Sequence, residues 1–275
     1  MSKNHLFRDR APITEAGWAE IEKEARRTLR AILAARRVVD FKGPLGWDAS
    51  DVELGRADPI AAPGQSNGVQ ARLRRIQPLV ELRVPFDVSR EELDAIDRGA
   101  RDPDLDSVIA AAREIAIAED RAVFHGYQAA QITGICQKRA SSAVPLGSSH
   151  ADYPGAVASA LTKLRDEGVE GPFAVVLNEQ LYKDLTSRTD GGYPIISHVQ
   201  RLVDGDIVWA AGLEGGVVVS MRGGDFELSV GQDFSIGYLE HNLERVRLYI
   251  EGSFTFLILT EQAAIPLSTD DPRKS

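Results

Sequence analysis

The chain has 275 residues, of which 43% are hydrophobic and 27% charged, so a fully disordered protein is excluded and one large domain or two small ones are expected. Its 41 acidic residues outnumber its 32 basic ones, and the net charge of −9 excludes a basic field over the whole protein that would attract nucleic acid. The single cysteine, Cys136, excludes an intrachain disulfide, and no apolar run approaches the roughly 20 residues of a membrane span, so we expect a soluble cytoplasmic protein.

The first strong helix pattern runs from Thr14 to Arg37. Thr14 is the predicted N-cap, because a threonine hydroxyl can accept a hydrogen bond from a free N–H of the first turn. Basic residues gather toward the end of the segment, where the helix dipole favours cations. One stripe of this helix is apolar, so the helix either packs on its own domain or offers part of that face to a partner. The stripe consists of Trp18, Ile21, Ala25, Leu29 and Ile32.

Residues 41–70 show no sustained hydrophobic period, and residues 42–46 carry a turn signature. Loops of more than about 12–15 residues are uncommon within a compact domain and usually have a function. An extended arm that pairs with another subunit would give the backbone groups of this segment their partners. We therefore expect residues 41–70 to form such an arm.

A strand and two helices are predicted next. Residues 79–86 alternate apolar and polar side chains, as in a half-buried strand. Ser89 and Glu92 form the pattern of a capping box, in which each side chain accepts from the other residue's free N–H. Pro103 marks the predicted start of a longer helix, which runs to about Phe124.

The second half of the chain changes from mixed structure to strands. Residues 126–149 are rich in turn residues and show no clear pattern. Helices are predicted at 156–167 and 178–185, with a buried strand between them at 173–177. A loop at 188–194 and a weak helix at 195–203 follow. Six strands are predicted at 207–210, 217–221, 226–230, 235–239, 245–250 and 254–260. This order predicts an α+β fold in which the early helices and the late strands share one core.

No catalytic constellation emerges from the sequence. Residues 64–68 match the nucleophile-elbow pattern G-x-S-x-G, but they lie in the irregular arm, without the strand and helix that this motif needs. The acidic residues at 102, 104 and 106 imitate the start of a calcium loop, but Ser107 replaces its glycine. No two histidines have the spacing of metal ligands. We expect no catalytic residue, no metal and no cofactor.

Three kinds of function stay open from the residues alone. The long arm favours a self-assembling structural protein. An enzyme whose site is assembled from scattered residues or across subunits is the second possibility, and a convergent acid–base pair would favour it. A binding module that uses the first helix is the third.

Thirteen short segments, in the same order along the chain, resemble those of one known family, and this resemblance distinguishes between the three kinds of function. The segments are residues 6–14 with Trp18, then 36–40, 43–47, 79–86, 92–94, 119–120, 171–173, 192–194, 222–226, 231–233, 235–238, 246–249 and 254–256. Together they resemble a family-one encapsulin, the bacterial nanocompartment shell protein of the linocin-like bacteriocin family. The most specific segment is Arg222-Gly223-Gly224-Asp225-Phe226, which the residues alone predict as a tight turn between strands.

The resemblance implies the phage-capsid fold of the Hong Kong 97 type, with a P-domain, an A-domain and an extended E-loop. It places the E-loop on the extended arm that is predicted from the missing hydrophobic periodicity of residues 41–70. The implied parts are an N-terminal arm and P-domain helix at 1–46, the E-loop at 47–74, the P-domain with its spine helix at 75–125, the A-domain at 126–222, P-domain strands at 223–267 and a disordered tail at 268–275.

The resemblance also implies a function without catalysis. Encapsulins form closed icosahedral shells, most often of about sixty copies, in the bacterial cytoplasm. The shell encloses a cargo enzyme that carries a C-terminal targeting peptide. A dye-decolourising peroxidase is the first expected cargo, with a role in oxidative stress, and a ferritin-like protein is the next. The alternative is the major capsid protein of a phage or prophage. We expect no nucleic acid and no membrane as partners.

Two sites follow from the resemblance. The cargo peptide is expected to bind in a groove between the first helix and the P-domain sheet, formed by Leu29, Leu33, Arg36, Asp40, Asp233, Ile236 and Tyr238. An apolar peptide would bury its side chains there while the charged residues hold its polar groups. Alternatively, Arg36 and Asp40 pair with each other and stabilise the shell.

The second site is a pore loop at the five-fold axis. It comprises Asp190, Gly191, Gly192 and Tyr193. A ring of Asp190 carboxylates would favour small cations, as rings of charge do in channels.

Overall fold

The computed structural model describes residues 5–63, 68–147, 149–190 and 192–269. The α-helices are α1 (Glu15–Ile32), α2 (Arg90–Asp97), α3 (Asp106–His125), α4 (Ile135–Lys138), α5 (Tyr153–Asp166), α6 (Glu179–Ser187) and α7 (Ile195–Gln200). The strands are β1 (Asp40–Lys42), β2 (Asp51–Ile60), β3 (Ala71–Pro78), β4 (Val80–Ser89), β5 (Val144–Pro145), β6 (Phe173–Leu177), β7 (Thr189–Asp190), β8 (Tyr193–Pro194), β9 (Ile207–Trp209), β10 (Gly216–Ser220), β11 (Phe226–Val230), β12 (Ser235–His241), β13 (Arg245–Ile258) and β14 (Ala264–Ser268). Short 3-10 turns lie between them, among them η1 (Arg8–Arg10) and η2 (Ala35–Arg37).

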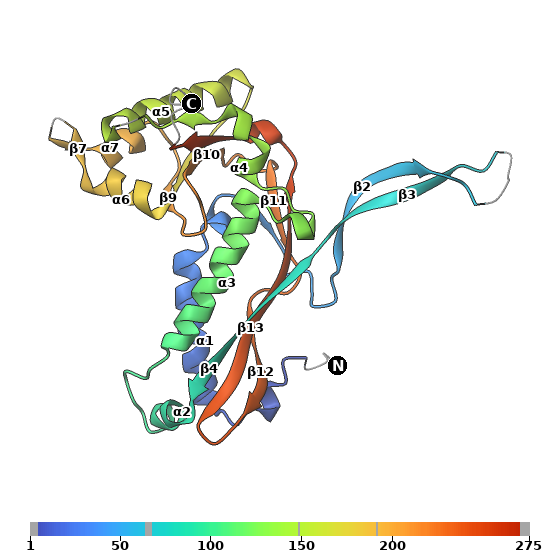
Figure 1. Cartoon of the computed structure of the whole chain (residues 1–275), viewed down its shortest axis with the longest axis vertical. Helices are drawn as coiled ribbons and strands as arrows, with labels where there is room; N and C mark the ends of the chain where they lie inside the picture. Colours follow the sequence, from blue (N-terminus) through green and yellow to red (C-terminus); the bar gives the residue numbers. More distant parts are fainter. Residues whose placement is uncertain (1–4, 64–67, 148, 191, 270–275) are drawn as a thin grey trace.

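The first sheet is built around the long strand β13. Its order is β1-β11-β13-β12, and β4 also pairs with β13. Helices α1 and α3 run beside this sheet through the elongated lower body (Figure 1). Their apolar faces share a core with the strands, including Ile21, Ile115 and Leu248, all fully buried. The prediction that the early helices and the late strands share a core is confirmed for the strands from residue 226 onward, whereas the predicted strands at 207–210 and 217–221 belong to the second sheet.

Two predicted strands, 245–250 and 254–260, are one continuous strand in the structure. Gly252 and Ser253, in the gap between the two predicted strands, continue the strand rather than form a turn. A Cβ added to Gly252 would lie 2.7 Å from Cδ1 of Phe234, so the glycine makes room for this ring rather than breaking the strand.

Helix α1 begins as predicted and ends earlier. The Thr14 hydroxyl accepts the N–H of Gly17 at 3.1 Å, which confirms the N-cap. The helix stops at Ile32 rather than at Arg37. The carboxylate of Asp120 on α3 accepts the N–H groups of Ala34 and Ala35 and so replaces their helical partners. A distant side chain therefore decides where α1 ends.

The predicted capping box is wrong. The Ser89 hydroxyl accepts the N–H of Glu91, whereas the Glu92 carboxylate accepts the N–H of Asp104 instead of returning to residue 89. Helix α3 starts at Asp106, not at Pro103, because the Asp104 carboxylate accepts the N–H of Asp106 and forms the turn before the helix. One face of α3 is buried along its length, at Val108, Ala112, Ile115, Glu119 and Val123.

The second sheet forms the upper part of the body. Its order is β5-β14-β10-β6-β9, and α5, α6 and α7 lie along it (Figure 1). The fully apolar strand β6 is buried throughout, as its sequence predicts. Strand β14 escaped prediction because Pro266 lies inside it, and proline lacks the N–H of a normal sheet residue. The predicted loop at 188–194 is in fact closed by the paired strands β7 and β8.

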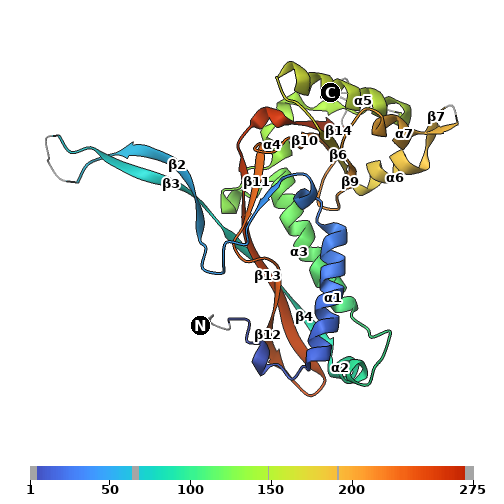
Figure 2. The same cartoon turned by 180° about the vertical axis from the view of Figure 1, so that it is seen from behind.

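Strands β2 and β3 form a two-stranded hairpin that projects far from the body (Figures 1 and 2). An extended arm is therefore present, but it spans β2 and β3 rather than residues 41–70, since Phe41 and Lys42 belong to β1 of the first sheet. Its pairing with another subunit stays a prediction. Residues 64–67 of the elbow-like pattern and residues 270–275 of the expected tail lie outside the described residues, and Ser268 belongs to β14. Within the described ranges, no helix is long and apolar enough to cross a membrane.

Candidate binding groove between α1 and β12

A groove of about 540 Å³ lies between α1 and the start of β12. Figure 2 shows both elements in the lower half of the body, with α1 in front. Its apolar lining comes from Leu6, Ala25, Leu29, Leu33, Phe234, Ile236 and Ile250. Ala25 and Leu29 belong to the predicted apolar stripe of α1. Leu29 lies at the edge of the stripe and is only half-buried, so it packs against the core and also lines the groove.

The polar end of the groove is built on Arg36. Its guanidinium binds both carboxylate oxygens of Glu119 at 2.7 Å and one oxygen of Asp233, also at 2.7 Å. The guanidinium also lies 4.8 Å from the ring centre of Phe234. Two carboxylates and an aromatic ring thus fix one arginine in a defined place.

Buried carboxylates lie directly behind this arginine. Glu119 is 1% exposed, and burial raises its pKa even though Arg36 acts in the opposite direction. Burial also raises the pKa of Asp120 to about 7, despite the two backbone N–H groups that donate to it. The junction between α1 and α3 therefore holds a carboxyl group that titrates near neutral pH.

Five of the seven residues expected in the groove line it: Leu29, Leu33, Arg36, Asp233 and Ile236. Asp40 lies instead in a separate small cleft, where its carboxylate accepts the N–H of Gly224 at 2.6 Å. The Tyr238 hydroxyl bonds to the ring of His241 at 2.6 Å, and Tyr238 does not line the groove. Since Arg36 pairs with Glu119 and Asp233, the alternative of an Arg36–Asp40 pair is wrong.

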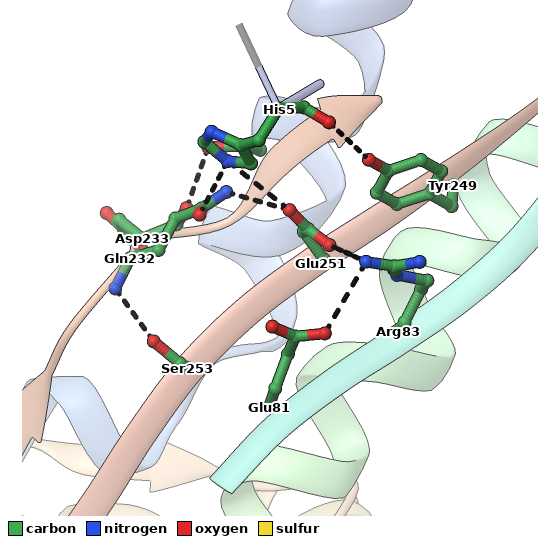
Figure 3. Close-up of polar contacts among 9 residues, drawn as sticks. His5, Glu81, Arg83, Gln232, Asp233, Tyr249, Glu251 and Ser253 are labelled. Atoms are coloured by element: carbon green, nitrogen blue, oxygen red, sulfur yellow. Dashed lines mark hydrogen bonds and ion pairs between the residues drawn. The ribbon is translucent and has the colours of Figure 1, made fainter. Parts of the chain in front are cut away.

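The N-terminal segment forms one wall of the groove. Figure 3 shows the imidazole of His5 beside the carboxamide of Gln232, at 2.9 Å, and the carboxylate of Glu251, at 3.5 Å. The carbonyl oxygen of Leu6 accepts the N–H of Tyr238 at 2.8 Å. The segment therefore lies along the outer edge of β12 and brings Leu6 into the groove.

This edge of β12 continues into the groove. Alternate residues of a strand direct their N–H and C=O groups to the same side. The N–H of Tyr238 points outward to Leu6, so the backbone of Ile236 also faces outward. An extended peptide could add to this edge as a further strand.

Sequence reasoning missed several residues of the groove. Arg26 and Arg30 line it, although their position near the end of α1 was interpreted only as dipole compensation. Their spacing of four residues, on either side of Leu29, is a signal that could have identified them. Leu6 and Glu119 come from distant segments and carry no such signal.

The expected pore loop lies on the β7–β8 turn at the far end of the second sheet (Figure 1). The backbone of Asp190 pairs with that of Tyr193, and Tyr193 is 65% exposed. Gly192 has a φ of 87°, which suits glycine in a tight turn. Gly191 lies outside the described residues.

Comparison with known proteins places this geometry in a family and a fold. The sequence profile of the family described as "Encapsulating protein for peroxidase" matches residues 3–255. The type 1 encapsulin shell protein of Rhodospirillum rubrum is 55% identical, over 96% of this chain and 96% of its own length. The virus-like particle from Pyrococcus furiosus has a TM-score of 0.63 at 13% identity, over 91% of this chain and 99% of its own. A Mycobacterium phage Bobi chain has a TM-score of 0.58 at 14% identity, over 88% of this chain and 91% of its own length.

The two solved structures show the fold alone, because their sequences are so different from this one. That fold is the expected Hong Kong 97 type of phage capsids and encapsulin shells, with mixed α and β structure.

Proposed function

The chain belongs to the type 1 encapsulin shell proteins, and on that premise we propose that it closes into an icosahedral shell of about 60 copies in the bacterial cytoplasm, around a cargo enzyme. Relatives of this kind have a structural, non-catalytic role as parts of a multimeric shell. The domain boundaries expected for the family, from the E-loop at 47–74 to the P-domain strands at 223–267, are part of the proposal.

The β2–β3 hairpin supports assembly. Ile60, Leu73 and Ile76 on this hairpin are between 50 and 62% exposed. A two-stranded hairpin is marginally stable at best on its own. A neighbouring subunit that covers the hairpin would bury these side chains and pair its open edges, and a closed shell would prevent further aggregation.

The groove between α1 and β12 carries the proposal for cargo. An extended C-terminal peptide of the cargo adds to the edge of β12 beside Leu6 and places apolar side chains on Leu29, Leu33 and Ile236. The fixed pair of Arg36 and Asp233 binds polar groups of the peptide. The family description supports a peroxidase, so a dye-decolourising peroxidase is the first candidate and a ferritin-like protein the second.

The loop at Asp190, Gly191, Gly192 and Tyr193 forms the five-fold pore in this proposal. Its position at the tip of a short ribbon and the exposure of Tyr193 support an opening between neighbouring subunits.

Light scattering with negative-stain imaging of the same sample tests the shell. We expect uniform hollow particles of megadalton mass. A monomer or dimer at every protein concentration and salt would contradict the proposal.

Cargo binding is tested by co-expressing the shell with a fluorescent protein that ends in the C-terminal segment of a candidate peroxidase. Leu29→Glu should reduce the fluorescence per shell to that of the fluorescent protein without the segment, because a carboxylate then occupies the apolar floor. The matched control is Ala19→Glu, which adds the same charge to an exposed position of α1 outside the groove and away from Arg26 and Arg30. Equal loading of both variants would refute the groove as the docking site.

A further inference from the structure

The charge of the groove is opposite in sign to that of the whole chain. The chain has a net charge of −9, whereas the groove is lined by five arginines and only two acidic residues. The charged lining consists of Arg8, Arg26, Arg30, Arg36, Arg37, Glu22 and Asp233. A surface that differs so clearly from the average of its chain selects a partner by charge.

Three of these arginines are already neutralised within the chain. Arg8 pairs with Glu22, Arg37 pairs with Asp206, and Arg36 pairs with Glu119 and Asp233. Ion pairs inside the protein therefore account for the positive charge at both ends of the groove.

Arg26 and Arg30 differ from the other three. Both side chains are exposed, and neither has an ion pair or a hydrogen bond to another described residue. They lie four residues apart on α1, which places them one helical turn from each other on one face. By contrast, Lys23 and Arg27 on the same helix pair with Glu20 and Glu24.

We infer that the groove binds a peptide that carries side-chain carboxylates, and that Arg26 and Arg30 recognise them. The inference rests on the proposed function of the groove and adds the chemistry of the partner. The peptide places its apolar side chains on Leu29 and Ile236 while its aspartate or glutamate side chains meet the two guanidinium groups. A planar guanidinium suits a carboxylate because it can donate two parallel hydrogen bonds.

The lining favours a peptide over a nucleic acid. Single-stranded nucleic acids bind to basic grooves that also offer aromatic rings on which bases stack. The aromatic ring in this lining belongs to Phe234, and the guanidinium of Arg36 already covers it at 4.8 Å. The aliphatic floor and the outward-facing backbone of Ile236 on β12 suit an extended peptide instead.

The test uses the full-length shell and a fluorescent protein with one of two C-terminal probe peptides. Both probes have twelve residues with Leu and Ile at alternate positions; one carries two Glu, and the other has Gln in their place. Fluorescence per particle measures loading at equal expression. We expect the Glu probe to load about fivefold better than the Gln probe, the effect of two exposed ion pairs.

Two shell variants identify the residues responsible. Arg26→Gln with Arg30→Gln should lower loading of the Glu probe to the level of the Gln probe. Lys23→Gln with Arg27→Gln removes the same charge from the same helix, outside the groove lining, and should leave the fivefold preference intact. Light scattering confirms that all shells assemble.

The outcomes separate the inference from the proposed function. If both probes load equally well, above the fluorescent protein without a peptide, the groove binds peptides but the inference is overturned. If neither probe loads into the wild-type shell, docking of an apolar peptide fails, and with it the proposed function of the groove. A third outcome is equal loading of the two probes together with a loss of nucleic acid: wild-type particles co-purify with nucleic acid, and the Arg26→Gln, Arg30→Gln shell does not. The two arginines then bind phosphates, and the peptide inference is overturned.

Discussion

Asp120 ties the end of α1 to α3, and its ionisation should make the stability of the protein depend on pH. Burial raises the pKa of this carboxyl to about 7, although the N–H groups of Ala34 and Ala35 donate to it at 3.0 and 2.9 Å. In the unfolded chain its pKa returns to the ordinary value of 3.8. Between about pH 4 and pH 7, the folded state therefore holds a proton that the unfolded state has lost. The stability from this group is complete below about pH 4 and is lost as the pH rises through 7.

The size of the effect follows from the two pKa values. A change from 3.8 to about 7 corresponds to roughly 4 kcal/mol of unfolding free energy. Asp120→Asn cannot ionise, so it removes this pH dependence. An amide oxygen can accept from one N–H while the NH₂ group faces the other, which costs about 1–3 kcal/mol at every pH. We therefore expect the variant to be less stable than wild type near pH 4, and the difference to close or reverse by pH 8.

Guanidinium unfolding followed by tryptophan fluorescence measures this difference between pH 4.5 and 8. The subunit concentration must be equal in all samples, because the stability of an assembly depends on it. Val123→Ala is the control, since it removes buried methyl groups from the same helix and should cost about 1–3 kcal/mol at every pH. A constant deficit of Asp120→Asn across this range would refute the reasoning.

Three further predictions concern other parts of the chain. Gly252→Ala should cost about 1–3 kcal/mol, because its Cβ would lie 2.7 Å from the ring of Phe234; an unchanged melting temperature would contradict this. Burial raises the pKa of the half-buried Cys136 thiol to about 12, so a thiol reagent at pH 8 should react far more slowly with the native shell than with the denatured chain, and equal rates would contradict this. Asp190→Asn should slow the entry of small cations about tenfold at low salt, measured with an enclosed metal-sensitive dye; unchanged entry would exclude the pore role.

Local patterns in the sequence predicted the elements whose signals are local. The N-cap at Thr14 and the apolar stripe of α1 depend on residues within a few turns, and both are confirmed. Two of the failed predictions were caused by distant residues. Asp120 ends α1 from 86 residues away. Phe234 packs on Gly252 and explains why β13 runs on through a glycine.

The groove residues also divide into those that the sequence could predict and those that depend on distant parts of the chain. The periodicity of α1 placed Leu29 on the apolar stripe, but the family resemblance alone supplied Leu29, Arg36, Asp233 and Ile236 as groove residues. Neither could supply Glu119, whose carboxylate holds Arg36 from 83 residues away. The partner of a buried charge depends on tertiary packing, because only an opposite charge held at close range offsets the cost of removing both groups from water.

The N-terminal segment contacts both the groove and the root of the projecting hairpin. The imidazole of His5 stacks on Trp47, with ring centres 4.5 Å apart, just before the chain enters β2. The next residue, Leu6, lines the groove and bonds to Tyr238. Glu251, only 2% exposed, lies between His5 and Arg83 and anchors the segment to β13 and β4 (Figure 3). A peptide that seats against Leu6 therefore contacts the segment that also supports the root of the hairpin. In the proposed shell, the docking groove and the root of the hairpin are therefore both in contact with residues 5 and 6.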